Sequence, residues 1–168
     1  MNQLDPFAAV STGSKNLDDL IGERMSKPGI SQCPGFPRGR ITQLWGSADS
    51  LEFMLNRIEG TVLRVSPKAP LSMMCSGEVD VIALDLSKET TIEDSRWWAA
   101  RLPVLKSVLK KSEIAVVGYS PEKVNWVAWK FMPSLRMEVT TTERGIRYRV
   151  VKNMMGASQG RTVEEVFE

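Results

Sequence analysis

The stretch Ile41-Thr-Gln-Leu-Trp-Gly-Ser-Ala-Asp-Ser-Leu-Glu-Phe-Met-Leu55 decides how the rest of the chain is interpreted. Its first five residues predict an apolar strand, Gly46 opens a short connection, and an amphipathic helix follows. This is the layout of a phosphate-binding loop, whose pattern is G-x-x-x-x-G-K-[ST]. In the register that starts at Gly46, Leu51 stands at the second glycine. Glu52 and Phe53 then stand at the lysine and at the hydroxyl residue.

The substituted positions argue against ATP chemistry at this loop. Glu52 places a carboxylate where a lysine would meet phosphate, and two like charges about 4 Å apart repel by roughly 4 kcal/mol at an effective dielectric near 20. Phe53 has no oxygen for Mg²⁺. Asp49 and Glu52 fit a capping box, in which Asp49 occupies the amides that would bind an anion. We expect ATP hydrolysis to be lost and the strand and helix to be kept because their apolar residues pack the core.

The composition limits the functions that the chain can perform. Its 168 residues are 42% hydrophobic and 25% charged, with a net charge of +2, which is ordinary for a single globular domain. The absence of histidine excludes Ser-His-Asp and Cys-His catalysis, and Cys33 and Cys75 have no metal-binding or redox spacing. No apolar run approaches the ~20 residues of a membrane span, and the N-terminus does not resemble a signal peptide. We therefore expect a cytoplasmic protein without a cofactor or a metal site.

Apolar periodicity predicts an α/β domain with buried parallel strands. Strands are expected at 41–45, 62–65, 79–84 and 114–119. Helices are expected at 49–58, 94–111 and 122–132. Thr90 and Glu93 fit a capping box before the second helix, and Pro103 is expected to kink or split it. The predicted organisation is a loop-rich segment with one short helix at 1–40, a core at 41–156 and a polar tail at 157–168 that frays or docks on a partner.

A β-hairpin with one buried face is predicted after the last helix. Leu135, Met137 and Val139 alternate with polar residues, and a second alternating run follows a turn at 143–145. Basic residues gather here and are candidates for sequence-independent phosphate contacts, namely Arg136, Arg144, Arg147, Arg149, Lys152 and Arg161. The alternative is an ordinary solvated face, in which Glu138 and Glu143 dilute the positive charge.

Five stretches, in the same order along the chain, resemble the RecA family. They are Ser11-Thr-Gly-Ser-Lys-Asn-Leu-Asp18, Gly35-Phe-Pro-Arg-Gly-Arg-Ile41, Val79-Asp-Val-Ile-Ala-Leu-Asp85, Ala128–Arg136 and Arg149–Asn153. The resemblance implies a RecA-like core of the P-loop NTPase type, with three layers and a mostly parallel sheet extended by an antiparallel C-terminal hairpin. It also implies that Asp85 holds the Walker B position. Without a lysine nearby, we expect Asp85 to accept hydrogen bonds from loop amides rather than to hold a metal ion.

The chain departs from that family at other functional positions. The place that resembles the family's catalytic glutamate falls near Ser66-Pro67. The family's mobile DNA-binding loops would correspond to Ser87–Asp94 and Pro121–Asn125, and both are short. The chain thus resembles a trimmed member of the family.

The tryptophans are candidates for a partner interface. Trp97 and Trp98 are adjacent, so on a helix they point about 100° apart, and at least one is a candidate for contact with a partner. Trp126 and Trp129 share a predicted helical face and would stack on bases or anchor a protein partner. The alternative is that they cover the core, as we expect for Trp45.

Taken with the altered loop, the resemblance implies a non-catalytic accessory factor in DNA replication, recombination or repair. It is similar to RecA-like accessory subunits of DNA polymerase complexes, and small forms of this kind are carried by phages, which would place it in the host cytoplasm. The implied partners are a DNA polymerase or recombinase protein and DNA, with no membrane. One alternative is a homo-oligomeric ring or filament, such as a clamp-like processivity factor. Another is an active ATPase with an unusual loop.

Overall fold

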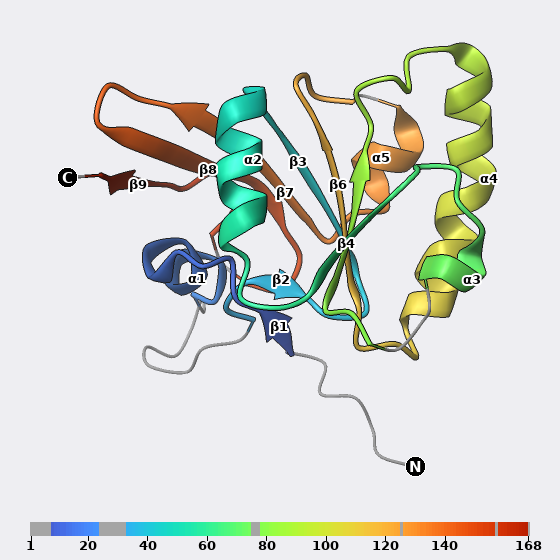
Figure 1. Ribbon diagram of the computed structural model, residues 1–168, viewed down its shortest axis with the longest axis horizontal. Helices are drawn as coiled ribbons and strands as arrows, with labels where there is room; N and C mark the ends of the chain where they lie inside the picture. Colours follow the sequence, from blue (N-terminus) through green and yellow to red (C-terminus); the bar gives the residue numbers. More distant parts are fainter. Residues whose placement is uncertain (1–7, 24–32, 75–77, 125, 157, 168) are drawn as a thin grey trace.

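The computed structural model describes residues 8–23, 33–74, 78–124, 126–156 and 158–167 (Figure 1). A seven-stranded sheet runs through the described part in the order β4-β5-β6-β3-β7-β8-β9. Its parallel strands are β3 (Ile41–Gly46), β4 (Val62–Val65), β5 (Val81–Asp85), β6 (Ala115–Ser120) and β7 (Leu135–Thr141). The antiparallel strands are β8 (Gly145–Asn153) and β9 (Thr162–Val166). The short strands β1 (Ala9–Val10) and β2 (Phe36–Pro37) form a separate antiparallel pair.

Helices cover both faces of the sheet, so the domain has three layers (Figure 1). One face carries α1 (Lys15–Ile21) and α2 (Ala48–Arg57), and the other carries α3 (Leu71–Met74), α4 (Ile92–Leu109) and α5 (Val127–Phe131). Two hydrophobic clusters fill the spaces between the layers. The mostly parallel sheet with antiparallel C-terminal strands confirms the predicted fold class.

The parallel strands read as continuous apolar runs because each of their two faces meets a helix layer. In β5, Val81 and Ala83 pack toward α1 and α2, whereas Ile82 and Leu84 pack toward α4. The same division holds in β6, where Val117 and Val116 belong to different clusters.

Several predicted boundaries were wrong by a few residues, and each difference has a local cause. The capping box of α4 uses Thr91 and Asp94, one residue later than the predicted Thr90 and Glu93. Because Thr91 is the N-cap, the helix starts at Ile92, before the predicted start at 94. It continues past Pro103 without a break. Helix α5 has only five residues, and its N-cap is Trp126. The predicted range of 122–132 was therefore too long, and its start was wrong.

Strand β9 was not predicted, since residues 157–168 were expected to form a polar tail. It pairs antiparallel with β8, and Arg147 lies opposite Glu164 in the register. Helix α1 contacts both β8 and β9. The side-chain amide of Asn153 donates to the carbonyl of Ile21 at 3.0 Å, and Arg57 of α2 forms an ion pair with Glu165. The N-terminal helix is thus fixed by the C-terminal strands.

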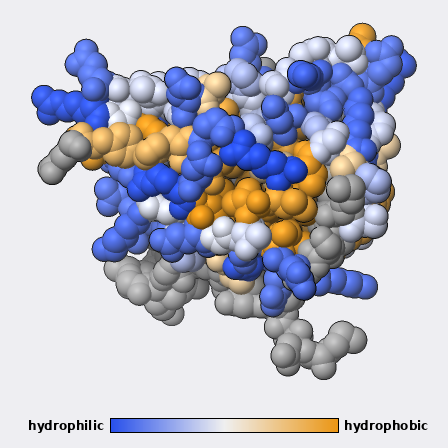
Figure 2. All heavy atoms as spheres, viewed as in Figure 1, coloured by the Kyte–Doolittle hydropathy of each residue, from blue (hydrophilic) through white to orange (hydrophobic). Residues whose placement is uncertain are grey.

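The two ends of the sheet are β4 and β9. Figure 2 shows mainly hydrophilic residues on the viewed face around a hydrophobic area, in the middle of the view, where β4 runs in Figure 1. Val62, Leu63 and Val65 of β4 are half-buried. No helix in the described part of the chain is long and apolar enough to cross a membrane.

The cap of α4 predicts an acid-sensitive component of stability. Asp94 accepts hydrogen bonds from Lys68 Nζ at 2.5 Å and from the Thr91 amide at 3.0 Å, and these contacts hold the pKa of its carboxyl well below the usual value. A depressed pKa contributes stability above the unfolded pKa of about 3.9, and this contribution is lost as the pH falls through the folded value. Asp94→Asn should lower the free energy of unfolding at pH 7 and make its decline below about pH 4 less steep.

Urea unfolding from pH 7 to pH 2 measures this effect. The matched control is Glu93→Gln, which removes an exposed carboxylate from the same helical turn and should leave the acid dependence as steep as in the wild type. Equal steepness in Asp94→Asn and the wild type would contradict the assignment.

Candidate functional site

The connection between β3 and α2 consists of a single residue, Ser47. Its side chain caps the helix by accepting the amide of Ser50 at 3.3 Å, and its carbonyl accepts the amide of Leu51 at 3.0 Å. The predicted capping box of Asp49 and Glu52 was therefore wrong, because both residues already lie inside α2. A phosphate-binding loop needs a longer run of bare amides to surround its anion.

Gly46 is required by packing against the neighbouring strand. It is the last residue of β3 and lies opposite Val139 of β7. A Cβ added to Gly46 would lie 2.0 Å from the carbonyl oxygen of Val139. This close approach accounts for the glycine without any phosphate ligand.

The three altered positions each have a structural contact. Leu51 is 2% exposed and packs in the core beneath α2. Glu52 accepts two hydrogen bonds from Arg64 of β4, at 2.7 and 2.8 Å, and this pairing lowers the pKa of the glutamate. The ring of Phe53 packs against that of Phe167, with centroids 4.7 Å apart. The side chains at the lysine and hydroxyl positions thus join α2 to β4 and to the segment after β9.

Asp85 lies at the carboxyl end of β5 and is exposed. Its Oδ1 accepts the amide of Ser87 at 2.9 Å, which agrees with the expected loop hydrogen bond. Asp85 and Glu52 both act electrostatically on Tyr119, whose pKa is raised mainly by burial. Around Tyr119, Asp85 and Glu52 carry two negative charges, and Arg64 carries one positive charge. The remaining negative charge opposes the binding of an anionic ligand. Within the described residues, no group of His, Cys, Asp or Glu could hold a metal ion.

One pocket of about 560 Å³ is lined by two short loops. They are the loops that were expected to correspond to the DNA-binding loops of the RecA family. Ser87 and Thr90 come from the connection after β5, and Pro121, Lys123 and Trp126 come from the connection after β6. Both loops meet at the carboxyl edge of the sheet because β5 and β6 are parallel neighbours. This edge is where α/β sheets commonly bind ligands.

Most of the late basic residues have a partner within the chain. Arg147 donates to Glu164 at 2.6 and 2.8 Å, and Arg149 lies 3.5 Å from Glu138. Arg161 forms an ion pair with Glu23, and Lys152 donates to the carbonyl of Phe131 at 3.0 Å. Arg144 is exposed near the turn between β7 and β8. The hairpin surface is thus largely charge-balanced.

Arg136 corrects the prediction that its side chain is on the wet face. It is 4% exposed, and its Nε donates to Gln43 Oε1 at 2.7 Å while its guanidinium lies 5.5 Å from the ring centre of Trp45. Gln43 and Trp45 of the neighbouring strand β3 lie on the same face of the sheet and pack against this side chain. Burial removes Arg136 from the exposed nucleic-acid candidates and lowers its pKa.

The four tryptophans considered as partner contacts divide into two buried and two half-buried rings. Trp98 and Trp129 are fully buried and meet edge to face at 5.1 Å, so neither is available to a partner. Trp97 is half-buried beside Trp98, with Lys68 and Arg101 over its ring. Trp126 is half-buried at the pocket of the carboxyl edge. Trp45 is buried, as predicted.

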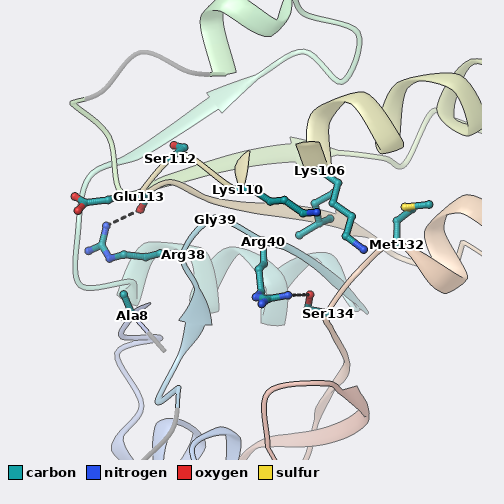
Figure 3. A pocket seen from close by; sticks show the side chains of 11 residues that line it. Ala8, Arg38, Gly39, Arg40, Lys106, Lys110, Ser112, Glu113, Met132 and Ser134 are labelled. Atoms are coloured by element: carbon teal, nitrogen blue, oxygen red, sulfur yellow. Dashed lines mark hydrogen bonds between the residues drawn. The ribbon is translucent and has the colours of Figure 1, made fainter. Parts of the chain in front are cut away.

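The remaining basic cluster was missed by the sequence analysis. A pocket of about 260 Å³ at the opposite edge of the sheet brings together Arg38, Arg40, Lys106 and Lys110 (Figure 3). These residues come from the turn before β3 and from the last part of α4 and its C-cap, and nothing in their spacing indicates that they meet.

The layers, strand order and helix positions are those of a RecA-like fold. The solved structure of the RadB recombinase matches with a TM-score of 0.67, covering 94% of this chain and 96% of that chain at 13% sequence identity. Comparisons with protein-family models and with curated proteins gave no match. The likeness to RadB establishes the fold and confirms that part of the predicted resemblance.

Proposed function

We propose that the protein is a non-catalytic RecA-like accessory factor in DNA recombination, repair or replication, which works by binding partners rather than by hydrolysing ATP. The observation that carries the proposal is the single-residue connection between β3 and α2, which offers no loop for phosphates. The Glu52–Arg64 pair supports it, because it occupies the side-chain position of the usual lysine. The similarity in fold to the RadB recombinase supports a role in DNA recombination, repair or replication.

The proposed contact with a DNA polymerase or recombinase lies at the carboxyl edge of the sheet. The half-buried Trp126 borders the pocket there. Helix α5 runs from Trp126 toward the amino edge and exposes Val127 at its start and Phe131 at its end, which are 72% and 61% accessible. Partly exposed aromatic and aliphatic side chains around a concave pocket are typical of protein interfaces. Trp97 remains a second candidate because its side chain is only half-buried.

Two measurements test this function. Isothermal calorimetry with ATP and Mg²⁺ should give no binding heat, and ATP should not raise the melting temperature. Affinity purification of the tagged protein from its native cell, followed by mass spectrometry, should recover a DNA polymerase or a recombinase. The variant Trp126→Ala/Phe131→Ala should lose that partner, whereas Lys88→Gln should retain it. Saturable ATP binding, or a wild-type purification without any DNA-processing protein, would overturn the proposal.

A self-assembling ring or filament is the second candidate. It is favoured by the outer edge of β9, which pairs with no further strand of the described residues and where Val166 and Phe167 are 58% and 42% accessible. Light scattering at increasing protein concentration, with and without DNA, decides it, and a constant monomer mass would exclude this alternative.

A further inference from the structure

The pocket at the amino edge of the sheet is built from segments that the fold holds firmly together. The turn Arg38-Gly39-Arg40 precedes β3, and the Gly39 amide donates to the carbonyl of Ile114 at 2.8 Å. Gly39 has a positive φ of 74°, and a Cβ there would lie 3.0 Å from the carbonyl oxygen of Leu109. Only glycine allows this approach, which brings the turn against the end of α4.

Three cationic side chains converge at this pocket. Figure 3 shows Arg40, Lys106 and Lys110 around it, with Arg40 directed toward Ser134 and the two lysine side chains lying side by side. No carboxylate of the described residues forms an ion pair with any of the three. The one polar contact drawn for Arg40 is a long one, 3.5 Å from its Nη1 to Ser134 Oγ.

The acidic groups nearby do not neutralise these cations. Glu113 lines the pocket, but Figure 3 shows its carboxylate directed away, beyond Arg38. Asp80 is occupied by Arg38 at 2.9 Å and by the amide of Thr61 at 2.8 Å. The carbonyl end of α4 adds a partial negative charge of about one half. Three full positive charges exceed it.

The positive charge extends beyond the pocket. Lys152 donates to the carbonyl of Phe131, next to the pocket residue Met132. Burial, Arg136 and Lys106 together lower the pKa of Lys152, which shows that these cations act on one another. Arg136 is buried, and its Nη2 has no hydrogen-bond partner among the described residues. Lys106 of the pocket and Lys152 are thus near enough to act on each other electrostatically.

We propose that this amino-edge pocket binds the phosphate backbone of a nucleic-acid strand through Arg40, Lys106 and Lys110, with Lys152 contacting a neighbouring phosphate. The pocket is smaller than the ~300–1,000 Å³ of typical small-molecule sites, so it suits one part of a larger polyanion. Recognition would be independent of sequence, because cations that contact phosphate oxygens do not read bases. The inference rests on the proposed role in DNA transactions and locates its nucleic-acid contact at the amino edge of the sheet, where only Lys152 of the hairpin residues takes part, and away from the carboxyl edge.

The test is fluorescence anisotropy with labelled single-stranded and duplex DNA across a series of NaCl concentrations. Lys106→Gln/Lys110→Gln should weaken binding about tenfold or more at 50 mM NaCl and reduce the slope of log affinity against log salt by about 1.5, since each lost phosphate contact removes ~0.7–0.9. The matched control is Lys88→Gln/Lys123→Gln, which removes two exposed lysines from the carboxyl edge and should leave the affinity unchanged. Thermal unfolding verifies that both variants fold, and Arg40→Gln provides a second pocket variant.

Other outcomes would overturn the proposal. The first is a wild-type protein that binds no DNA at 50 mM NaCl. The second is a loss of DNA affinity that occurs only in the carboxyl-edge control or in Arg147→Gln/Arg149→Gln. The third is thermal stabilisation of the protein by pyrophosphate without any DNA binding. None of these results affects partner recovery in the affinity purification. Failure of this inference and failure of the proposed function are therefore distinguishable.

Discussion

Replacing Trp98 by alanine is expected to lower the free energy of unfolding by about 3–5 kcal/mol. Trp98 is fully buried between α4 and the sheet, and its ring contacts Trp97 at 4.8 Å and Trp129 at 5.1 Å. The loss includes the transfer of a large aromatic ring and the cavity that it leaves. Since the free energy of unfolding of such domains is only about 5–15 kcal/mol, this substitution removes a large part of it. Urea unfolding monitored by circular dichroism measures it.

Two controls separate packing from other contributions. Trp98→Phe keeps an aromatic ring and removes an indole N–H that lacks a partner among the described residues, so its effect should be much smaller than that of alanine. Trp97→Ala should also cost much less, because Trp97 is only half-buried. A loss at Trp97→Ala as large as that at Trp98→Ala would show that the two rings had been assigned the wrong roles.

Restoring the motif residues, with Leu51→Gly, Glu52→Lys and Phe53→Thr together, is expected to destabilise the protein without creating an ATP site. Leu51 is 2% exposed in the core, and its removal costs about 2–5 kcal/mol, with about 1 more for glycine within a helix. The connection from β3 to α2 would still be the single residue Ser47. Calorimetry with ATP and Mg²⁺ should therefore show no binding, and urea unfolding should show the loss of stability.

Glu52→Lys alone is the matched control. It removes an exposed pair with Arg64, and such pairs contribute about 0–1 kcal/mol, so the protein should stay folded. Tight ATP binding by either variant would show that side chains, rather than the geometry of the connection, limit nucleotide binding.

The parallel core was predictable because buried strands and amphipathic helices leave strong patterns in the sequence. Strands β3, β4, β5 and β6 all lie within two residues of their predicted ranges. The start of α2 was predicted near Asp49 from a polar pattern that several residues fit, and the structure uses Ser47 as the cap instead. Capping is decided by local backbone geometry, which a pattern of polar residues does not fix.

Burial of polar residues was less predictable. Alternation in β7 predicted that Arg136 faces water, but Gln43 and Trp45 of β3 pack against its side chain, which is 4% exposed. Strand β9 was missed because only Val163 of its middle residues is apolar and its pairing with β8 depends on the backbone. The amino-edge pocket joins Arg40 to Lys106 and Lys110, and only the fold brings these residues together.

The contact of α1 with β8 and β9 also determines when the protein can finish folding. Helix α1 has seven residues, too short to be stable alone, so Leu17 and Ile21 remain without their full packing until the last strands are made. A ribosome synthesises β8 and β9 well after α1, so α1 waits for its packing partners. Among the described elements, α1 is therefore one of the last to become protected from proteases and from hydrogen exchange.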